Sequence, residues 1–412
     1  MTSTVPARGK TVSPTGRRYA QLVIVLGALI ALGPLTIDMY LPAFPRIGDE
    51  LGASDSAVQL TLTGMLLGLA VGQLVIGPLS DAFGRRRPLV IGLGAHAGAS
   101  LLCAIAPTVG VLAAVRVVQG LAGAALSVVA MAIVRDLFAG VAVARIMSRL
   151  MLVIGLAPIL APSIGSLVLG FTSWRGIFVV LAGAALLLVL VAALGIRETL
   201  PPERRRPATV RATLGAYRVL LGDRVFVALA FVGGSMLAAM FAYVSGASFV
   251  LQDGFGMDAR TFGLVFGLNA AGLTVTSQLN PVLLRHFSVR NVLTGAVVGA
   301  TLASAALLVV GLTGFGGLAG VLVPLALVVS LAGLAIPNTP ALALTRHGEA
   351  AGTAAAVLGC VQFGVGAVVA PLVGAFGSTT AAPMGGVMLG VTLLAAVLLF
   401  GVVRRERSPA FR

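Results

Sequence analysis

The sequence predicts an all-α polytopic membrane protein of twelve transmembrane helices, arranged as two six-helix pseudo-repeats. Of its 412 residues, 58% are hydrophobic and only 10% are charged, whereas soluble domains carry roughly 25% charged residues. Apolar runs of about 20 residues, the length that crosses a bilayer core, recur along nearly the whole chain. The 53 glycines suit membrane helices, because small residues let helix backbones approach closely.

The apolar runs place the helices, and the charges orient them. The expected spans are 20–42, 56–80, 88–108, 110–134, 146–170, 175–196, 224–250, 261–283, 291–314, 317–340, 353–377 and 384–403. A porin-like barrel is excluded, because its strands alternate apolar and polar residues over about 10 residues. With the N-terminus in the cytoplasm, nearly all of the 28 basic residues fall in cytoplasmic segments. This positive-inside bias predicts that both termini are cytoplasmic. It also assigns the net charge of +15 to topology and lipid headgroups, not to nucleic acid.

A polar stretch divides the chain into two halves of six spans. The predicted division is a cytoplasmic N-terminal tail (1–19), an N-terminal bundle (20–196), a cytoplasmic linker (197–223), a C-terminal bundle (224–403) and a cytoplasmic tail (404–412). Ala161–Gly165 in span five and Ala370–Gly374 in span eleven share an Ala-Pro-x-x-Gly pattern. Two such repeats place a substrate site between the halves.

No metal or nucleotide chemistry is expected. Cys103 and Cys360 lie inside apolar runs, and His96, His286 and His347 show no ligand spacing, so we expect neither a disulfide nor a metal site. The chain also lacks a phosphate-binding G-x-x-x-x-G-K-[ST] loop, so ATP is not the expected energy source.

The loop between spans two and three carries the most specific motif. Gly77, Asp81, Gly84 and Arg85 stand in the run GPLSDAFGRRR. This run resembles the signature loop of the major facilitator superfamily, G-x-L-a-D-r-x-G-r-[RK]. The resemblance implies that Asp81 and Arg85 help latch the two halves on the cytoplasmic side. The alternative is an ordinary turn with anchoring arginines.

Span four contains Arg116 and Gln119 in RVVQGLAGAA, which resembles the superfamily motif R-x-x-Q-G-x-g-a-a. An arginine within a span is costly and should face the bundle interior and a partner. Alternatively, Arg116 lies near the outer surface and snorkels to it.

Span five contains Pro158, Pro162 and Gly165 in GLAPILAPSIG. This run resembles the antiporter motif g-x-x-x-G-P-x-x-G-g, with Ala157 in place of the glycine before proline. The resemblance implies a bend that seals the path and favours exchange, and the alternative is a plain packing kink.

Asp38 in span one is the acidic residue that the sequence places within a span. Burial favours the neutral form of a carboxyl group, so we expect Asp38 to bind the coupling proton, with Arg116 opposing that protonation. The alternative is that Asp38 caps or pairs structurally near the outer end of its span.

The runs DMYLPAFP from Asp38, APILAP from Ala157, WRGIF from Trp174 and YVSGASFVLQ from Tyr243 resemble the Bcr/CflA multidrug-resistance transporters. This resemblance extends from about Tyr19 to Arg404. It implies drug/proton antiport at the bacterial cytoplasmic membrane, driven by the proton-motive force without a cofactor. The implied substrates are drugs such as bicyclomycin, phenicols, sulfonamides or tetracycline.

Polar and aromatic side chains at mid-span are candidates for the substrate cavity, although structural hydrogen bonding or packing would explain each equally well. They are Tyr40, Gln119, Tyr243, Asn269, Gln278, Asn338, Gln362 and Phe363. Export of an endogenous metabolite or self-made antibiotic on the same scaffold is the alternative function. A membrane enzyme would need convergent catalytic groups, and a channel would need a denser polar lining. We expect a monomer, with the glycine stripe Gly64, Gly68 and Gly72 packing internal helices.

Overall fold

The structure is a computed structural model that describes residues 16–138, 141–205, 210–345, 347, 350–377 and 379–403. Twelve helices in these ranges are long and apolar enough to cross a membrane, and they confirm the predicted fold class. The first six spans are built from α1 (Gly16–Asp38), α3 (Asp55–Phe83), α4 (Arg86–Ala104), α5 (Val109–Leu137), α6 (Val141–Leu169) and α7 (Trp174–Gly195). The last six are built from α9 (Arg224–Ser248), α10 (Ala259–Leu283), α11 (Val289–Thr313), α12 (Gly317–Leu344), α13 (Ala351–Val369) and α15 (Ala381–Leu398).

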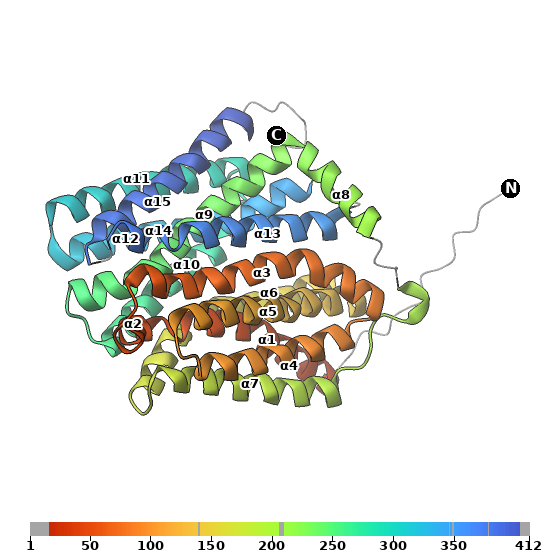
Figure 1. Cartoon of the computed structure of the whole chain (residues 1–412). Coiled ribbons are helices and arrows are strands. Elements are labelled where there is room, and N and C mark those ends of the chain that lie inside the picture. The colour runs from red at the N-terminus through yellow and green to blue at the C-terminus, as the bar shows by residue number, and fades with distance from the viewer. Residues whose placement is uncertain are drawn as a thin grey trace.

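The spans run side by side, with the first six below the last six in Figure 1. We call these groups the N half and the C half. The end of the bundle that carries the α3–α4 turn and helix α8 (Val210–Gly222) is the linker end, and the opposite end is the far end. Most of the predicted terminal tails lies outside the described residues.

Local capping explains where several spans begin. Ser54 and Thr108 accept hydrogen bonds from backbone N–H groups in the first turns of α3 and α5. Asp223 and Asp258 do the same for α9 and α10. Such side chains satisfy N–H groups that have no partner within the helix.

Three features differ from the predicted spans. After α1 the chain continues through a short 3₁₀ turn, η1 (Leu41–Ala43), into α2 (Phe44–Leu51). The predicted linker contains α8, a helix of 13 residues that is too short to be recognised as a membrane span. The eleventh span ends its regular helix at Val369 and resumes as α14 (Leu372–Ala375), because Pro371 cannot continue the backbone hydrogen bonds.

The glycine stripe packs two helices of the N half together. A Cβ atom at Gly64, Gly68 or Gly72 would overlap atoms of α5. This close approach of α3 to α5 confirms that the stripe packs internal helices.

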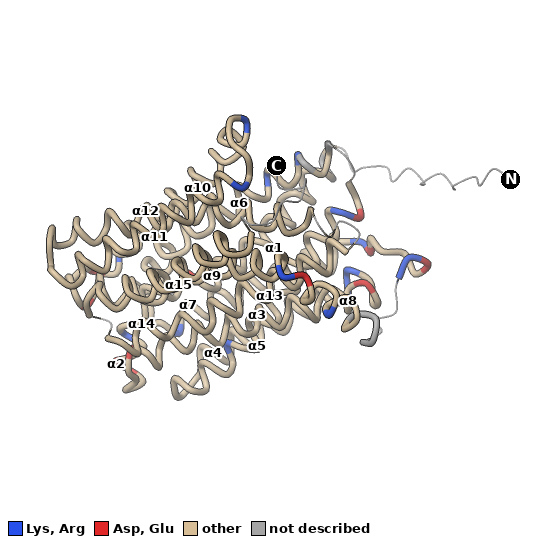
Figure 2. The backbone as a smooth tube through the Cα atoms, turned by 90° about the horizontal axis from the view of Figure 1, so that it is seen from above, with Lys and Arg blue, Asp and Glu red and all other residues tan. Residues whose placement is uncertain are grey.

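Charged residues gather mainly at the two ends of the bundle, and more of them lie at the linker end (Figure 2). At the far end, Glu50 accepts hydrogen bonds from the Trp174 indole and from Arg175. This contact ties α2 to the start of α7.

Candidate functional site: a buried polar cluster and a sealed far end

Asp38 ends α1 and is 97% buried, since its exposed fraction is 3%. No hydrogen bond or ion pair joins its carboxyl group to another residue of the described ranges. It lies close enough to the Tyr243 hydroxyl of α9 for their charges to interact. The carboxyl group is therefore buried where the two halves meet, without the structural partner that the capping alternative requires.

Arg116 is fully buried within the N half and does not snorkel to the surface. Its Nη1 donates to the Thr36 carbonyl oxygen (3.1 Å) and to Gln119 Oε1 (2.7 Å). The guanidinium carbon lies 4.2 Å from the centre of the Tyr40 ring, a distance at which a cation is attracted to an aromatic face. The Nε and Nη2 atoms are buried without a partner among the described residues. This cation therefore keeps two free donors.

Gln119 extends the cluster toward α4. Its Nε2 donates to Ser100 Oγ at 2.7 Å, and Cys103 Sγ lies 4.0 Å from its Oε1. Gln119 thus connects Arg116 to α4 inside the N half, which is the structural role left open for it. Tyr40 is similar, because its hydroxyl lies 3.3 Å from Thr61 Oγ1.

The proline-rich segment of α6 lies against the residue that follows Asp38. A Cβ atom at Gly165 would overlap the Met39 carbonyl oxygen. On the other side, Gly263 of α10 packs against the Pro162 carbonyl group. The segment that resembles an antiporter motif therefore holds the end of α1 and contacts the C half.

In the C half, Tyr243 and Asn269 form a buried pair. Asn269 Nδ2 donates to the Tyr243 hydroxyl at 3.1 Å, and the Tyr243 ring stacks on Phe266 with ring centres 4.9 Å apart. This pair joins α9 to α10 on the side of the C half that approaches Asp38.

The other candidates in the C half have separate surroundings. Asn338 and Asn280 exchange two amide hydrogen bonds, of 2.7 and 3.3 Å, between α12 and α10. Gln362 has a buried Nε2 without a partner in the described chain, and Phe363 packs near Phe241 with ring centres 6.3 Å apart. Gln278 is exposed near the linker end of α10.

At the far end, Gln59 of α3 bridges the two halves. This fully buried side chain donates from Nε2 to the Ser245 carbonyl oxygen (3.2 Å) and accepts from the Gly374 N–H (2.8 Å). Both ends of its amide group are therefore bound to backbone groups of the C half.

Further contacts close the far end. Ser248 Oγ donates to the Leu41 carbonyl oxygen at 2.8 Å, and Gln252 Nε2 to that of Pro42 at 3.3 Å. Ser166 Oγ of α6 donates to the Ala259 carbonyl oxygen at 2.7 Å. Together with Gln59, these contacts join η1, α3 and α6 of the N half to the C half, so this end is sealed.

At the linker end, the motif loop forms an ion cluster around Arg85. Its Nη1 donates to Asp81 Oδ1 and Ser80 Oγ, both at 2.6 Å, and its Nε to Asp136 Oδ2 at 2.9 Å. Burial alone would lower the pKa of Arg85, but the hydrogen bonds and charges of Asp136 and Asp81 raise it above its ordinary value. These contacts lie within the N half, so the latch between the halves stays a prediction.

Glu198, three residues after the end of α7 at Gly195, caps the start of α4. Burial alone would raise the pKa of this carboxyl group, but backbone N–H donors hold it below its ordinary value. Those donors are Leu200, Arg85, Arg86 and Thr199. A carboxylate at a helix N-terminus also interacts favourably with the helix dipole.

The glycines of the motif loop have different surroundings. Gly84 adopts φ +88°, a conformation that favours glycine, and a Cβ atom there would overlap Glu198. Gly77 has open space around it. The close approach of Glu198 thus explains why glycine occupies position 84.

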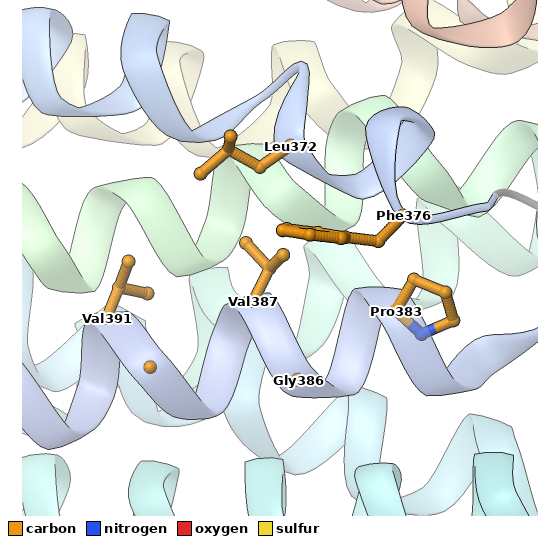
Figure 3. A pocket seen from close by; sticks show the side chains of 7 residues that line it. Leu372, Phe376, Pro383, Gly386, Val387 and Val391 are labelled. Carbon is orange, nitrogen blue, oxygen red and sulfur yellow. The ribbon is translucent and has the colours of Figure 1, made fainter.

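None of the predicted substrate residues lines either of two surface pockets. The first, about 390 Å³, is an apolar pocket between α14 and α15, where Phe376 lies over Val387 (Figure 3). The second, about 380 Å³, lies at the far end beside Asp49, Asp55 and Asp253.

Sequence reasoning did not single out Gln59, Ser248 and Gln252, which seal the far end. The sequence feature that could have indicated them is a polar side chain near the far end of an apolar span. However, their partners are backbone groups, which leave no pattern in a sequence.

Comparison with known proteins agrees with this architecture. The family description Major Facilitator Superfamily matches residues 24–371. The chain is 40% identical to the "Uncharacterized MFS-type transporter YdgK" of Bacillus subtilis, over 96% of this chain and 98% of that protein. It is 33% identical to the "Bicyclomycin resistance protein homolog" of Haemophilus influenzae, over 88% and 91%. It is 30% identical to "Multidrug resistance protein MdtL" of Klebsiella pneumoniae, over 65% and 67%.

Solved structures show the same fold. The xylose transporter XylE of E. coli aligns with a TM-score of 0.73 at 13% identity, over 95% of this chain and 100% of that one. A bacterial homologue of the lysosomal transporter Spinster aligns with a TM-score of 0.73 at 16% identity, over 96% and 100%.

The fold and the matched family define a multi-pass membrane transporter rather than an enzyme. The chain belongs to the major facilitator superfamily, in its Bcr/CflA-type branch.

Proposed function

We propose that this transporter exports small drug-like molecules from the bacterial cytoplasm in exchange for protons. The observation that carries the proposal is Asp38, a buried carboxyl group without a partner in the described chain, located where the two halves meet. An ionisable side chain within a membrane span is costly and is usually functional. The names of two relatives, a bicyclomycin resistance protein homologue and a multidrug resistance protein, support drugs as the transported class.

The linker end faces the cytoplasm in this proposal, and both termini lie there. The support is the positive-inside bias of the loops. The far end then faces outward. Because hydrogen bonds across the halves seal it, the described arrangement is closed to the outside.

The proton step uses Asp38 and Arg116. When Asp38 is protonated, it offers little attraction to the guanidinium group, and Arg116 stays with Thr36 and Gln119. When Asp38 loses its proton, the two unpaired donors of Arg116 can turn toward the carboxylate, and such charge-assisted bonds are strong. We propose that drug binding requires the ionised form of Asp38, so that drug binding and protonation of Asp38 are mutually exclusive.

The substrate contacts are aromatic and amide groups of the C half. Tyr243 lies close enough to Asp38 for their charges to interact, and Asn269 donates to the Tyr243 hydroxyl. Gln362 supplies an amide donor that has no partner in the described chain. Phe363 adds an apolar face. A few polar groups in a largely apolar wall are typical of small-molecule sites.

Alternating access requires the far-end contacts to break and re-form in each cycle. We propose that the two halves rock about their interface, as repeat-built transporters do. One proton moving down the membrane potential supplies about 2.3 kcal/mol per 100 mV. At about 1.4 kcal/mol per tenfold ratio, this sustains roughly a fiftyfold gradient of a neutral drug.

Proteoliposomes with an imposed pH gradient test the function. We expect the purified chain to move at least one compound of an antibiotic panel that includes bicyclomycin, faster with a gradient than without. Drug addition should also release protons from the detergent-purified protein. Drug transport that ignores the pH gradient would contradict antiport and would leave a facilitator or a different coupling ion.

A further inference from the structure

His96, near the middle of α4, is fully buried, and both of its ring nitrogens point at oxygen atoms. Nε2 lies 3.2 Å from Thr36 Oγ1, and Nδ1 lies 3.4 Å from the Gln119 carbonyl oxygen. Thr36 Oγ1 itself lies 2.6 Å from the Leu32 carbonyl oxygen, to which it donates. The imidazole thus connects α4 to α1, two residues before Asp38, and to α5, three residues after Arg116.

The three contacts around His96 and Thr36 need three protons if each is to be a hydrogen bond. The carbonyl oxygens of Leu32 and Gln119 only accept hydrogen bonds, so all three contacts need three protons. The Thr36 hydroxyl supplies one, and a neutral imidazole supplies one. A neutral His96 therefore leaves one contact without a proton, and only the imidazolium form satisfies all three.

We propose that His96 is a second binding site for the coupling proton, which moves between the Asp38 carboxyl group and His96 Nδ1. This inference rests on the proton-coupled transport proposed above. When Asp38 gives up its proton and His96 gains one at Nδ1, Nε2 keeps its hydrogen bond to Thr36. The new N–H donates to the Gln119 carbonyl oxygen.

The total charge of Asp38, Arg116 and His96 favours sharing of one proton between Asp38 and His96. With the proton on Asp38, Arg116 carries the one charge. With the proton on His96, the ionised Asp38 balances the second cation, and the net charge of the cluster is unchanged. Adding a proton without ionising Asp38 would place two cations in a water-free interior, which is strongly unfavourable.

The charged groups near His96 either oppose or favour a positive imidazole. Arg116 on α5 opposes a positive imidazole, and ionised Asp38 on α1 favours it. Cys103 on α4 is a further titratable group, and it stands one helical turn beyond Ser100. The other charged residues of α1, α3, α4, α5 and α7 lie near the ends of those helices. Asp38 is therefore the acidic group within these spans that we expect to offset the charge of His96.

Isotope labelling of histidine in the full-length protein, in lipid nanodiscs, tests this directly. The chain has three histidines, so His96→Gln identifies the His96 signals by NMR, and His286→Gln is the matched control. Between about pH 8 and 5, the usual range of histidine switching, we expect the unprotonated ring nitrogen of His96 to gain a proton. In Asp38→Asn we expect this change to be lost from that range.

Two results would overturn the inference. One is a His96 ring that stays neutral throughout this pH range in the wild-type protein. The other is a titration that is identical in Asp38→Asn. Neither depends on transport, so failure of the proposed antiport is recognised separately, as the absence of drug-driven proton release. If antiport holds, His96→Gln should bind drug while its proton release changes in pH profile, and unchanged signals from the other histidines would show that it is folded.

Discussion

The two halves have related topology but bury different kinds of polar group. The N half buries Asp38, Arg116 and His96. Within the described residues, Asp38 has no hydrogen-bond partner, Arg116 keeps two unpartnered nitrogens, and a neutral His96 leaves one contact without a proton. Such a cluster changes its energy when one proton arrives or leaves.

The C half, within the described residues, buries neutral amide and hydroxyl groups at mid-span. Tyr243 pairs with Asn269, and Asn280 pairs with Asn338. Neutral pairs do not respond to a proton. This difference supports the proposal that proton chemistry belongs to the N half, while the C half contributes shape and hydrogen bonds to the substrate.

Asp38→Asn should have the largest effect. Asparagine has a similar shape but cannot release a proton, so we expect drug-driven proton release to fall to background and uphill efflux to stop. Asp49→Asn, at an exposed far-end acid, should leave both intact. Normal proton release from Asp38→Asn would break the assignment of coupling to the N half.

Arg116→Met should destabilise the N half. The Thr36 carbonyl oxygen and Gln119 Oε1 would lose their donor, and each buried acceptor left unsatisfied costs about 1–3 kcal/mol. Thermal unfolding in detergent should show a clear decrease in Tm. Arg260→Met, at an exposed position, should change stability by no more than about 0.5 kcal/mol.

Asn338→Ala should destabilise the C half without uncoupling transport. Removing one partner leaves the Asn280 amide unsatisfied, which costs about 1–3 kcal/mol. Because the two residues contact each other, the double variant with Asn280→Ala should lose less than the sum of the single losses. The ratio of protons released to drug bound should stay at the wild-type value, and a changed ratio would mean that the C half takes part in coupling.

Gln59→Leu should weaken the far-end seal. It removes two hydrogen bonds worth about 0.5–1.5 kcal/mol each, so the equilibrium ratio of molecules with a closed far end to those with an open one should fall by roughly tenfold. Hydrogen exchange of the backbone around Ser245 and Gly374 should become faster. Gln278→Leu, at an exposed position near the linker end of α10, serves as the control, and equal acceleration in it would argue against a specific seal.

Glu198 should produce the smallest effect, visible only in acid. Its pKa in the folded protein lies below the ordinary value of 4.5, so its ionised form stabilises the fold above that value. This stabilisation is lost as the pH falls through the lowered pKa. The decrease in Tm on acidification should be shallower in Glu198→Gln, and identical profiles would remove this role.

Most of the fold followed from hydrophobic length and charge, because bilayer thickness sets both the spacing and the ends of spans. Helices α2 and α8 did not follow. They lie where the chain leaves the hydrocarbon region, and hydropathy no longer distinguishes helix from loop there.

The candidate site followed only in part. An acid and an arginine within spans are visible in a sequence, and Asp38 and Arg116 are indeed buried. Their partners were not visible. Arg116 bonds a backbone carbonyl group on α1, Gln119 belongs to its cluster, and His96 looked isolated because its contacts come from helices distant in the chain.

The far-end seal has a consequence for how such a carrier can change. Gln59, Ser248, Gln252 and Ser166 all bind main-chain groups of the opposite half. A main-chain carbonyl group remains whatever side chain its residue carries, so most substitutions on the accepting side keep these bonds as long as the four polar side chains stay. Residues that contact the substrate can then diversify while the far end still closes.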